Sequence, residues 1–498
     1  MLKKFRVLLA ALAFICITLL FMGIGQDWFG WLAKLQFLPA VLRVTAGALG
    51  FNLLILVGII LLTFIFGRIY CSVICPLGVM QDVVFWIRKK LYPVFHKGKS
   101  GKGLKLALKY AKENKILRYT VFAAYVVCLI AGLQVVIALL APYSAYGRMV
   151  RSLASTWATG AFGGPASPQT VSLTIVAIVT FIVITAVAAL TGRSWCNAVC
   201  PVGTTLSFFS RFAMFRPVID KDACIGCHSC ERKCKAHCID VSTKTIDYSR
   251  CVDCFDCIDS CPKGVLNYKY AYAKKASAPA APSKSEDASG RRAFIQGAAI
   301  AIGAAAAGEV SAIAQEVKLD GGFADVLPKK NPERAEKLVP PGSRGVKEFY
   351  SHCTACQLCV AACPNGVLRP SKDLAHLMQP EMGFENGHCR PECTTCSNIC
   401  PAGAILPITK EEKTAIHVGQ AKVNLDLCVV RRDDVDCGNC SRHCPTGAIV
   451  MVKDEKTGRR IPTVNEELCI GCGACENLCP SRPISAIHVD GLKKHITA

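Results

Sequence analysis

Most of the 31 cysteines in this chain stand two or three residues apart, in short runs. Two runs within residues 217–268 share the spacing x2, x2, x3, and a proline follows the second run. In bacterial two-cluster ferredoxins, three cysteines of such a run bind one [4Fe–4S] cluster and the fourth binds the other cluster. The first expected ligand set is Cys224, Cys227, Cys230 and Cys261. The second expected set is Cys251, Cys254, Cys257 and Cys234.

Sixteen further cysteines form four runs within residues 316–498. Two runs are regular, namely Cys353, Cys356, Cys359 and Cys363, and Cys469, Cys472, Cys475 and Cys479. A third run is one residue wider, with Cys389, Cys393, Cys396 and Cys400. The fourth has a long insert after its first ligand, with Cys428, Cys437, Cys440 and Cys444. These runs predict four more [4Fe–4S] clusters, and ligand sharing between adjacent runs or between outer and inner runs fits the spacing equally well.

Disulfides and zinc are the alternative uses of so many cysteines. Gaps of two and three residues converge on one point, which favours a metal cluster over crosslinks that close long loops. A zinc site needs only four ligands in looser grouping. Cys238 is left over and is interpreted as an ordinary small buried residue.

Long apolar stretches precede the cysteine-rich parts, and the chain is 52% hydrophobic. Four stretches approach or exceed the roughly 20 residues that cross a bilayer: Val7–Gly25, Leu49–Phe66, Tyr119–Ala141 and Val171–Leu190. Between Arg88 and Arg118 stand eleven Lys or Arg residues and one acid. Such a basic loop between spans is expected on the cytoplasmic side, as is the basic N-terminus. The net charge of +22 is therefore read as membrane topology and not as nucleic-acid binding.

The membrane half, residues 1–216, contains a repeat. Gly67-Arg68 followed by Cys71-x3-Cys75-Pro76 recurs 125 residues later as Gly192-Arg193 followed by Cys196-x3-Cys200-Pro201. The fold expected is an α-helical membrane domain of four spans, built as a duplicated helix pair, with α+β ferredoxin domains attached. Three roles are open for the four repeated cysteines, Cys71, Cys75, Cys196 and Cys200. They could be redox-active thiols, ligands of a seventh metal centre, or small packing residues.

A linker rich in Ala, Pro, Ser and Lys is expected over residues 269–290. The segment 291–315 opens with Arg291-Arg292 and continues as an Ala/Gly-rich apolar run, which is typical of a twin-arginine export signal and supplies a fifth span. Domains whose folding depends on metal must be assembled before export, because metal binding is largely folding. We therefore expect the first ferredoxin domain in the cytoplasm and residues 316–498 in the periplasm. Cleavage after Ala314 is left open.

Together these features resemble two known families. The four spans, the two repeated motifs and the first ferredoxin domain are similar to the NapH-type quinol dehydrogenase membrane subunit of the NosR and CcoG-like group. The twin-arginine segment and the four outer runs are similar to the NapG/MauM-type periplasmic ferredoxin. The whole chain thus resembles a fusion of the two, in the inner membrane of a bacterium.

The resemblance implies electron transfer from membrane quinol through the [4Fe–4S] clusters to a periplasmic cytochrome or reductase. Haem is not expected, because all ten histidines lie outside the four apolar stretches. Weak candidates for a quinol site are Asp27, Trp28, Tyr143 and Arg148, although Trp and Tyr also form ordinary interfacial belts. The alternative is a non-catalytic relay or accessory subunit for maturation or activation of a metalloenzyme. The quinone type, terminal acceptor, direction of electron flow and oligomeric state stay open.

Overall fold

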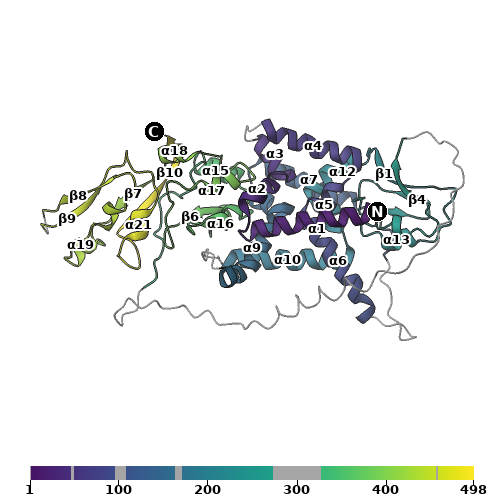
Figure 1. Ribbon diagram of the computed structural model, residues 1–498, viewed down its shortest axis with the longest axis horizontal. Helices are drawn as coiled ribbons and strands as arrows, with labels where there is room; N and C mark the ends of the chain where they lie inside the picture. The colour runs from purple at the N-terminus through teal and green to yellow at the C-terminus, as the bar shows by residue number, and fades with distance from the viewer. Residues whose placement is uncertain are drawn as a thin grey trace. The chain divides into compact units, whose positions relative to one another are not determined.

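The computed structural model describes residues 2–45, 50–95, 108–162, 171–272, 327–455 and 458–497. Residues 1–271 and 329–498 together make one compact unit (Figure 1). The linker, the twin-arginine segment and the expected fifth span lie outside the described residues. The helices of the N-terminal half are α1 (Leu2–Phe21), α2 (Gln26–Lys34), α3 (Phe37–Thr45), α4 (Gly50–Phe66), α5 (Ile69–Val73), α6 (Pro76–Phe95), α7 (Lys115–Ile130), α8 (Gln134–Leu140), α9 (Pro142–Phe162), α10 (Val171–Thr191), α11 (Ser194–Ala198) and α12 (Pro201–Ser210).

Two of the described helices are long and apolar enough to cross a membrane, Leu2–Phe21 and Leu173–Thr191. A third, α4, is apolar but has 17 residues. The expected third span, Tyr119–Ala141, is not one helix. It divides into α7 and α8 at Gly132, whose φ of 72° ends the first helix.

The segments that connect the expected spans contain helices of their own. Helices α2 and α3 lie between the first two spans, and α9 lies between the last two. The basic loop is also partly helical, because α6 continues to Phe95. The apolar residues of α3 pack into the same buried cluster as those of α1 and α4, so this connection is part of the packed structure.

The two glycines of the repeat have a definite structural role. Gly67 ends α4 with a φ of 76° and Gly192 ends α10 with a φ of 68°, a conformation that glycine adopts without cost. A Cβ at Gly67 would collide with the carboxylate of Asp253, and one at Gly192 would lie 2.5 Å from the carbonyl oxygen of Lys235. Both glycines therefore allow the first ferredoxin domain to approach the ends of these two helices.

The first ferredoxin domain has the small α+β architecture that its spacing predicted. Strands β1 (Phe215–Ile219) and β4 (Leu266–Tyr270) pair antiparallel, as do β2 (Ile239–Asp240) and β3 (Thr245–Ile246). Short helices α13 (Ser229–Lys233) and η1 (Ile258–Ser260) carry cysteines at or beside their ends. The paired strands extend the expected domain, 217–268, by two residues at each end.

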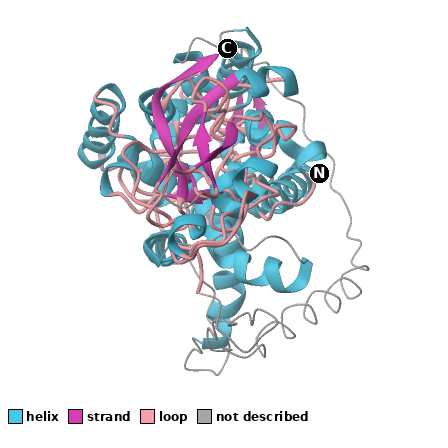
Figure 2. Cartoon of the chain, turned by 90° about the vertical axis from the view of Figure 1, so that its left-hand side faces the viewer, coloured by secondary structure: helices cyan, strands magenta, loops and turns pink. Residues whose placement is uncertain are grey.

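The C-terminal part holds three two-stranded antiparallel sheets, and the strands face the viewer in Figure 2. Its elements are α15 (Val346–His352), α16 (Leu358–Ala362), β5 (Leu368–Pro370), η2 (Leu374–His376), β6 (Pro380–Met382), α17 (Thr395–Ile399), α18 (Lys410–Ala415), β7 (Ile416–Val423), α19 (Val429–Arg432), α20 (Asn439–Arg442), β8 (Ile449–Lys453), β9 (Arg460–Val464), α21 (Ala474–Leu478) and β10 (Ile487–Thr497). Strand β10 pairs with β7, β5 with β6, and β8 with β9. Cysteines are a large share of the buried core here, so these loops need bound clusters to fold.

Candidate functional site: the cysteine groups

Two cavities in the first ferredoxin domain are lined by the two expected ligand sets. The first inner group, Cys224, Cys227, Cys230 and Cys261, lines one of these cavities. The second inner group, Cys234, Cys251, Cys254 and Cys257, lines the other. The extra cysteine, Cys238, also borders the second cavity, and its Sγ lies 3.5 Å from the Sγ of Cys234. Cys238 is buried, as expected, but it lies beside a ligand set.

The outer cysteines pair between adjacent runs, a choice that the spacing left open. The second outer group, Cys363, Cys389, Cys393 and Cys396, lines one cavity. The third outer group, Cys428, Cys437, Cys440 and Cys479, lines another. The first outer group is Cys353, Cys356, Cys359 and Cys400, whose thiols interact electrostatically with one another. The fourth outer group is Cys444, Cys469, Cys472 and Cys475.

These four outer groups follow one another in space in an order that differs from the chain. Cys359 of the first group interacts with Cys396 of the second. The amide of Cys389, in the second group, donates to the carbonyl oxygen of Cys472, in the fourth, at 2.9 Å. Cys475 of the fourth group interacts in turn with Cys440 of the third. In space the outer groups therefore lie in the order first, second, fourth and third.

The thiol groups fit iron–sulfur clusters better than single metal ions. Among the described residues, no three His, Cys, Asp or Glu side chains converge closely enough for one ion. In a cubane cluster each thiolate binds a different iron, so the sulfur atoms stay farther apart. Burial raises the pKa of Cys356 to about 11 and that of Cys472 to about 12. Iron must therefore displace the protons of these thiols, which links cluster binding to pH.

A buried charge network attaches the inner groups to the helical part. Asp82 of α6 accepts from Arg193 Nε at 2.8 Å, and its carboxylate lies 3.0 Å from Lys235 Nζ and 3.1 Å from Arg6. Lys235 directly follows Cys234, the last cysteine of its run. In each of the other five ferredoxin runs, a proline follows the last cysteine. Burial alone would raise the pKa of Asp82, but Arg193 and Lys235 hold that pKa well below its usual range. The carboxylate is therefore charged and joins helices to the ferredoxin domain.

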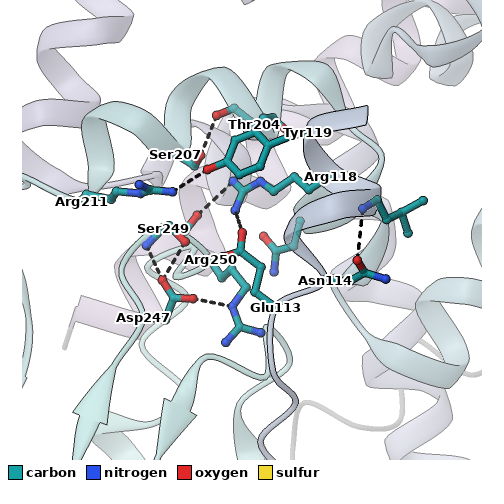
Figure 3. A network of polar contacts seen from close by, with 12 residues as sticks. Glu113, Asn114, Arg118, Tyr119, Thr204, Ser207, Arg211, Asp247, Ser249 and Arg250 are labelled. Carbon is teal, nitrogen blue, oxygen red and sulfur yellow. Dashed lines mark hydrogen bonds and ion pairs between the residues drawn. The ribbon is translucent and has the colours of Figure 1, made fainter. Parts of the chain in front are cut away.

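A second network joins α7 to the same domain and to the residue that follows α12 (Figure 3). The fully buried Arg118 pairs with Glu113 and donates to the carbonyl oxygen of Ser249 at 3.4 Å. Arg211 donates to the Tyr119 hydroxyl at 2.8 Å. The inner groups are thus held by charged side chains on several helices.

The outer groups contact the helical part mainly through apolar residues and carbonyl groups. Leu358, Ala362 and Ile399 belong to the same buried cluster as α1, α3 and α4. Arg43 of α3 donates to the carbonyl oxygen of Cys400, and Gln134 of α8 to that of Ser351. A Cβ at Gly147 would collide with Phe21 and lie 2.6 Å from the carbonyl oxygen of Cys356.

The inner and outer regions contact opposite ends of the same helices. In α1, Lys3 pairs with Asp256 at 2.7 Å, and Gly23, just beyond the other end, lies against Ala361. In α10, Leu173 packs with Met378, whereas the carbonyl oxygen of Thr191 lies 3.0 Å from His237 Nε2. Helix α1 has 20 residues, a length of about 30 Å.

The four quinol-site candidates divide into two pairs. Asp27 and Trp28 are exposed on α2, and Trp28 is 80% exposed. Tyr143 and Arg148 are buried on α9, beside the first outer group. Tyr143 interacts with Cys356 and Cys400, and Arg148 with Cys356. The Tyr143 hydroxyl and all three guanidinium nitrogens of Arg148 have no hydrogen-bond partner within the described part of the chain.

The four cysteines of the repeat come together. Cys71, Cys75, Cys196 and Cys200 are each at most 5% exposed. Cys75 interacts with Cys71 and Cys196, and Cys200 with all three others. The repeat of 125 residues was the sequence signal for this convergence.

Comparison with known proteins identifies iron–sulfur domains in four stretches of the chain. A "4Fe-4S binding domain" model matches residues 49–93 and again 173–218, which are the two copies of the repeat. A "4Fe-4S dicluster domain" model matches residues 435–482, and another "4Fe-4S binding domain" model matches 346–369. No solved structure matches the chain.

Several curated proteins are similar to part of this chain. A "Methylamine utilization ferredoxin-type protein MauM" of Paracoccus denitrificans is 32% identical over 181 residues, covering 32% of this chain and 75% of the relative. The MauM protein of Methylophilus methylotrophus is 32% identical over 31% of this chain and 71% of its own length. The "Ferredoxin-type protein NapF" of Escherichia coli strain K12 is 29% identical over 36% of this chain and all of the relative.

Proposed function

The chain belongs to the family of ferredoxin-type iron–sulfur proteins that includes MauM, and from that premise we propose that it carries electrons from a membrane quinol to a redox acceptor outside the cytoplasm. Bound [4Fe–4S] clusters, six in the two ferredoxin regions, would supply the one-electron chemistry. The cysteine groups described above are the residues that would hold them. A periplasmic cytochrome or reductase is the proposed acceptor.

One observation carries this proposal: the two ferredoxin regions contact opposite ends of helices that are apolar on their free faces. On α4 the exposed side chains include Phe51, Leu54 and Leu61, and on α7 they include Ile116 and Val127. Large contiguous apolar surface of this kind is rare on proteins that stay in water. It supports a bundle of four helices embedded in lipid, with α7 and α8 together forming the third crossing. The inner groups would then face the cytoplasm and the outer groups the periplasm of the bacterial inner membrane.

The proposed quinol site is formed by Tyr143 and Arg148. A quinol that loses two electrons also loses two protons, so its site needs polar groups that bind the hydroxyl oxygens. Arg148 offers buried donors that the protein itself leaves unpartnered, next to a cysteine of the first outer group. A buried polar group without a partner is costly, which favours a ligand that completes its hydrogen bonds. Asp27 and Trp28, being exposed on α2, would at most line the approach from the lipid.

The direct test adds a quinol analogue to the oxidised, purified full-length protein under anaerobic conditions. We expect reduction of the clusters by the quinol to bleach the iron–sulfur absorbance. In the Tyr143→Phe and Arg148→Gln variants this bleaching should be at least tenfold slower. Tyr146→Phe is the matched control, because Tyr146 lies one turn away and its hydroxyl is already bonded to Thr18 at 2.6 Å. Absence of bleaching in the cluster-loaded wild type would refute quinol oxidation. It would leave the relay or accessory subunit as the better reading.

The two-sided arrangement has a separate test. A reporter that is active only outside the cytoplasm is fused after residue 280 and, in a second fusion, after residue 330. Activity is expected only from the second fusion. Activity from both fusions, or from neither, would contradict the proposed topology.

A further inference from the structure

We infer that Cys71, Cys75, Cys196 and Cys200 bind a seventh iron–sulfur cluster, of the 4Fe–4S type, between the two copies of the repeat. The inference goes beyond the proposed function and does not depend on it. It begins with the convergence of four buried thiols from two segments that lie 125 residues apart in the chain. Ordinary packing gives no reason for four buried cysteines from two distant segments to gather in one region.

The arrangement around these thiols is nearly symmetric between the copies. Arg68 reaches across to the carbonyl oxygen of Cys196 at 3.2 Å, and Arg193 reaches across to that of Cys71 at 2.9 Å. Each arginine also approaches the cysteine three residues after it, Arg68 with Cys71 Sγ at 4.0 Å and Arg193 with Cys196 Sγ at 3.9 Å. Both guanidinium groups are fully buried. Two buried cations therefore face the thiols, which suits ligands that are thiolates in the bound state.

The helices that follow each motif add a second set of donors. Cys200 caps α12 with its Sγ 3.4 Å from the amide of Gly203, and Cys75 accepts likewise from the amide of Gly78. Helix N-termini stabilise thiolates. A Cβ at Gly203 would lie 2.7 Å from the Arg68 guanidinium, and one at Gly78 would lie 2.6 Å from that of Arg193. The glycine two residues after each Cys-Pro pair thus makes room for the arginine of the other copy.

Several buried donors at this place lack a protein partner. Gln81 is fully buried, its Oε1 lies 3.4 Å from Cys196 Sγ, and its Nε2 has no hydrogen-bond acceptor. Arg193 Nη2 and Trp195 Nε1 are likewise unpartnered in the part of the chain that is described. Sulfide and thiolate sulfurs of a cluster accept such N–H groups. The orphaned donors are therefore a second indication of a ligand, independent of the cysteines.

A cluster fits these thiols better than a single ion or a disulfide pair. As with the ferredoxin groups, these four side chains do not converge closely enough for one ion. The 4Fe–4S domain model matches both copies of the repeat and supports the same cluster type. All four thiols are free in the structure.

The centre lies between the outer and inner groups. On one side, Arg193 donates its amide to the carbonyl oxygen of Lys235 at 2.9 Å, next to Cys234 of the second inner group. On the other side, Tyr70 interacts with Cys75, and Tyr143 interacts with both Tyr70 and Cys356 of the first outer group. A cluster at this position would divide the separation between the two ferredoxin regions into shorter stages.

Iron and acid-labile sulfide per chain test the inference on the full-length protein, purified anaerobically in detergent. Seven clusters correspond to about 28 iron atoms, against about 24 for six. We expect the Cys71→Ser/Cys196→Ser variant to contain about four fewer iron atoms than wild type prepared in parallel. The control is Cys16→Ser/Cys128→Ser, which removes two cysteines outside every group and should lose no iron.

Two further measurements guard against a variant that simply folds badly. Each of the four single Cys→Ser variants should lose iron from the same cluster, with unchanged electron paramagnetic resonance signals from the ferredoxin groups. The Gln81→Leu variant should keep its iron but shift the reduction potential of one cluster, because it removes the neighbouring amide. Iron content equal to wild type in the double variant would overturn the inference, and so would a loss shared evenly by all clusters.

Discussion

The inner and outer ferredoxin regions are attached to the helices by different physical means. The inner region is held by buried charges, with Asp82, Arg193 and Lys235 at the centre. The outer region is held by apolar packing and by donors such as Arg43 that reach backbone carbonyl groups. Buried ion pairs depend strongly on every partner being present, whereas apolar contacts are replaceable.

This difference is what a chain with a cytoplasmic and an external face would need. Basic side chains, including Lys3, Arg6 and Arg193, stand at the helix ends that lie nearest the inner region. The inner ferredoxin domain supplies an acid that pairs with Lys3, namely Asp256. The helix ends that meet the outer domain also carry basic side chains, including Arg43 and Arg148. The outer domain has no comparable carboxylate network with the helices among the ion pairs of the described residues.

The largest effects should come from cysteines of one run that belong to the ligand group of another run. Both regions contain such cysteines. Cys400→Ser should remove the first outer cluster, whose other ligands precede it by more than forty residues, and Cys363→Ser should remove the second. Each variant should lose about four iron atoms, because the replacement of one ligand removes a whole [4Fe–4S] cluster. Resolved paramagnetic signals and iron content measure this. If the two variants lost the same cluster, ligand sharing between these adjacent runs would be wrong.

The cysteine spacing predicted the two inner ligand sets from its x2 and x3 gaps, and those same sets line the two cavities of that domain. The same spacing could not decide the outer pairing. Four runs allow several pairings, and the choice depends on long-range contacts that the spacing does not contain. The wide run and the run with a long insert still form groups like the regular ones. The extra residues, which in the long insert include α19, do not move the ligands away.

Apolar length was a weaker guide to the helices than spacing was to the ligands. It located the main bodies of α1, α4 and α10 but missed the break at Gly132, since isolated glycines occur within helices as well as at their ends. It also missed α2, α3 and α9. Tyr143 and Arg148 were candidates from the sequence, but their closeness to Cys356 was beyond its reach, because that contact joins residues more than 200 positions apart.

Asp82→Asn should be the most damaging change at the inner attachment. It leaves Arg6, Arg193 and Lys235 buried without their common carboxylate, at a cost of about 3–5 kcal/mol in the free energy of unfolding. The inner clusters should then be lost on mild heating while the outer clusters remain. Cluster absorbance during thermal denaturation follows this. Asp259→Asn is the control, because that carboxylate is half exposed and lies 3.8 Å from Lys3. Equal melting of both variants would show that the buried network does not hold this region.

Arg43→Ala should have a smaller effect, confined to the outer attachment. It removes the donor to the carbonyl oxygen of Cys400 and a bond to Asn52 at 3.3 Å, at a cost of about 1–3 kcal/mol. Removing a buried positive charge beside the first outer group should also lower the reduction potential of that cluster alone. A redox titration followed by paramagnetic resonance measures the shift. Arg88→Ala is the control, since Arg88 also donates to backbone carbonyls but at the end of α10, away from the outer groups. A shift of equal size in that control would show that the charge at Arg43 does not set the reduction potential of the first outer cluster.

The smallest effect is expected at Lys3, the exposed partner of a carboxylate that the buried Lys235 also binds. Lys3 and Lys235 bind the same carboxylate, that of Asp256, at 2.7 Å and 3.2 Å. The shorter contact should nevertheless be the weaker one, because the Lys3 side chain is 37% exposed and that of Lys235 only 7%. Exposed pairs contribute less than about 1 kcal/mol and are screened by salt. Removing a buried lysine costs more, because it leaves a buried carboxylate without its partner. Lys3→Ala should therefore change the melting of the inner clusters slightly at low salt and not at all at high salt. Lys235→Ala should lower the melting at both salt concentrations, and the reverse order would mean that contact distance, not burial, decides how this region is held.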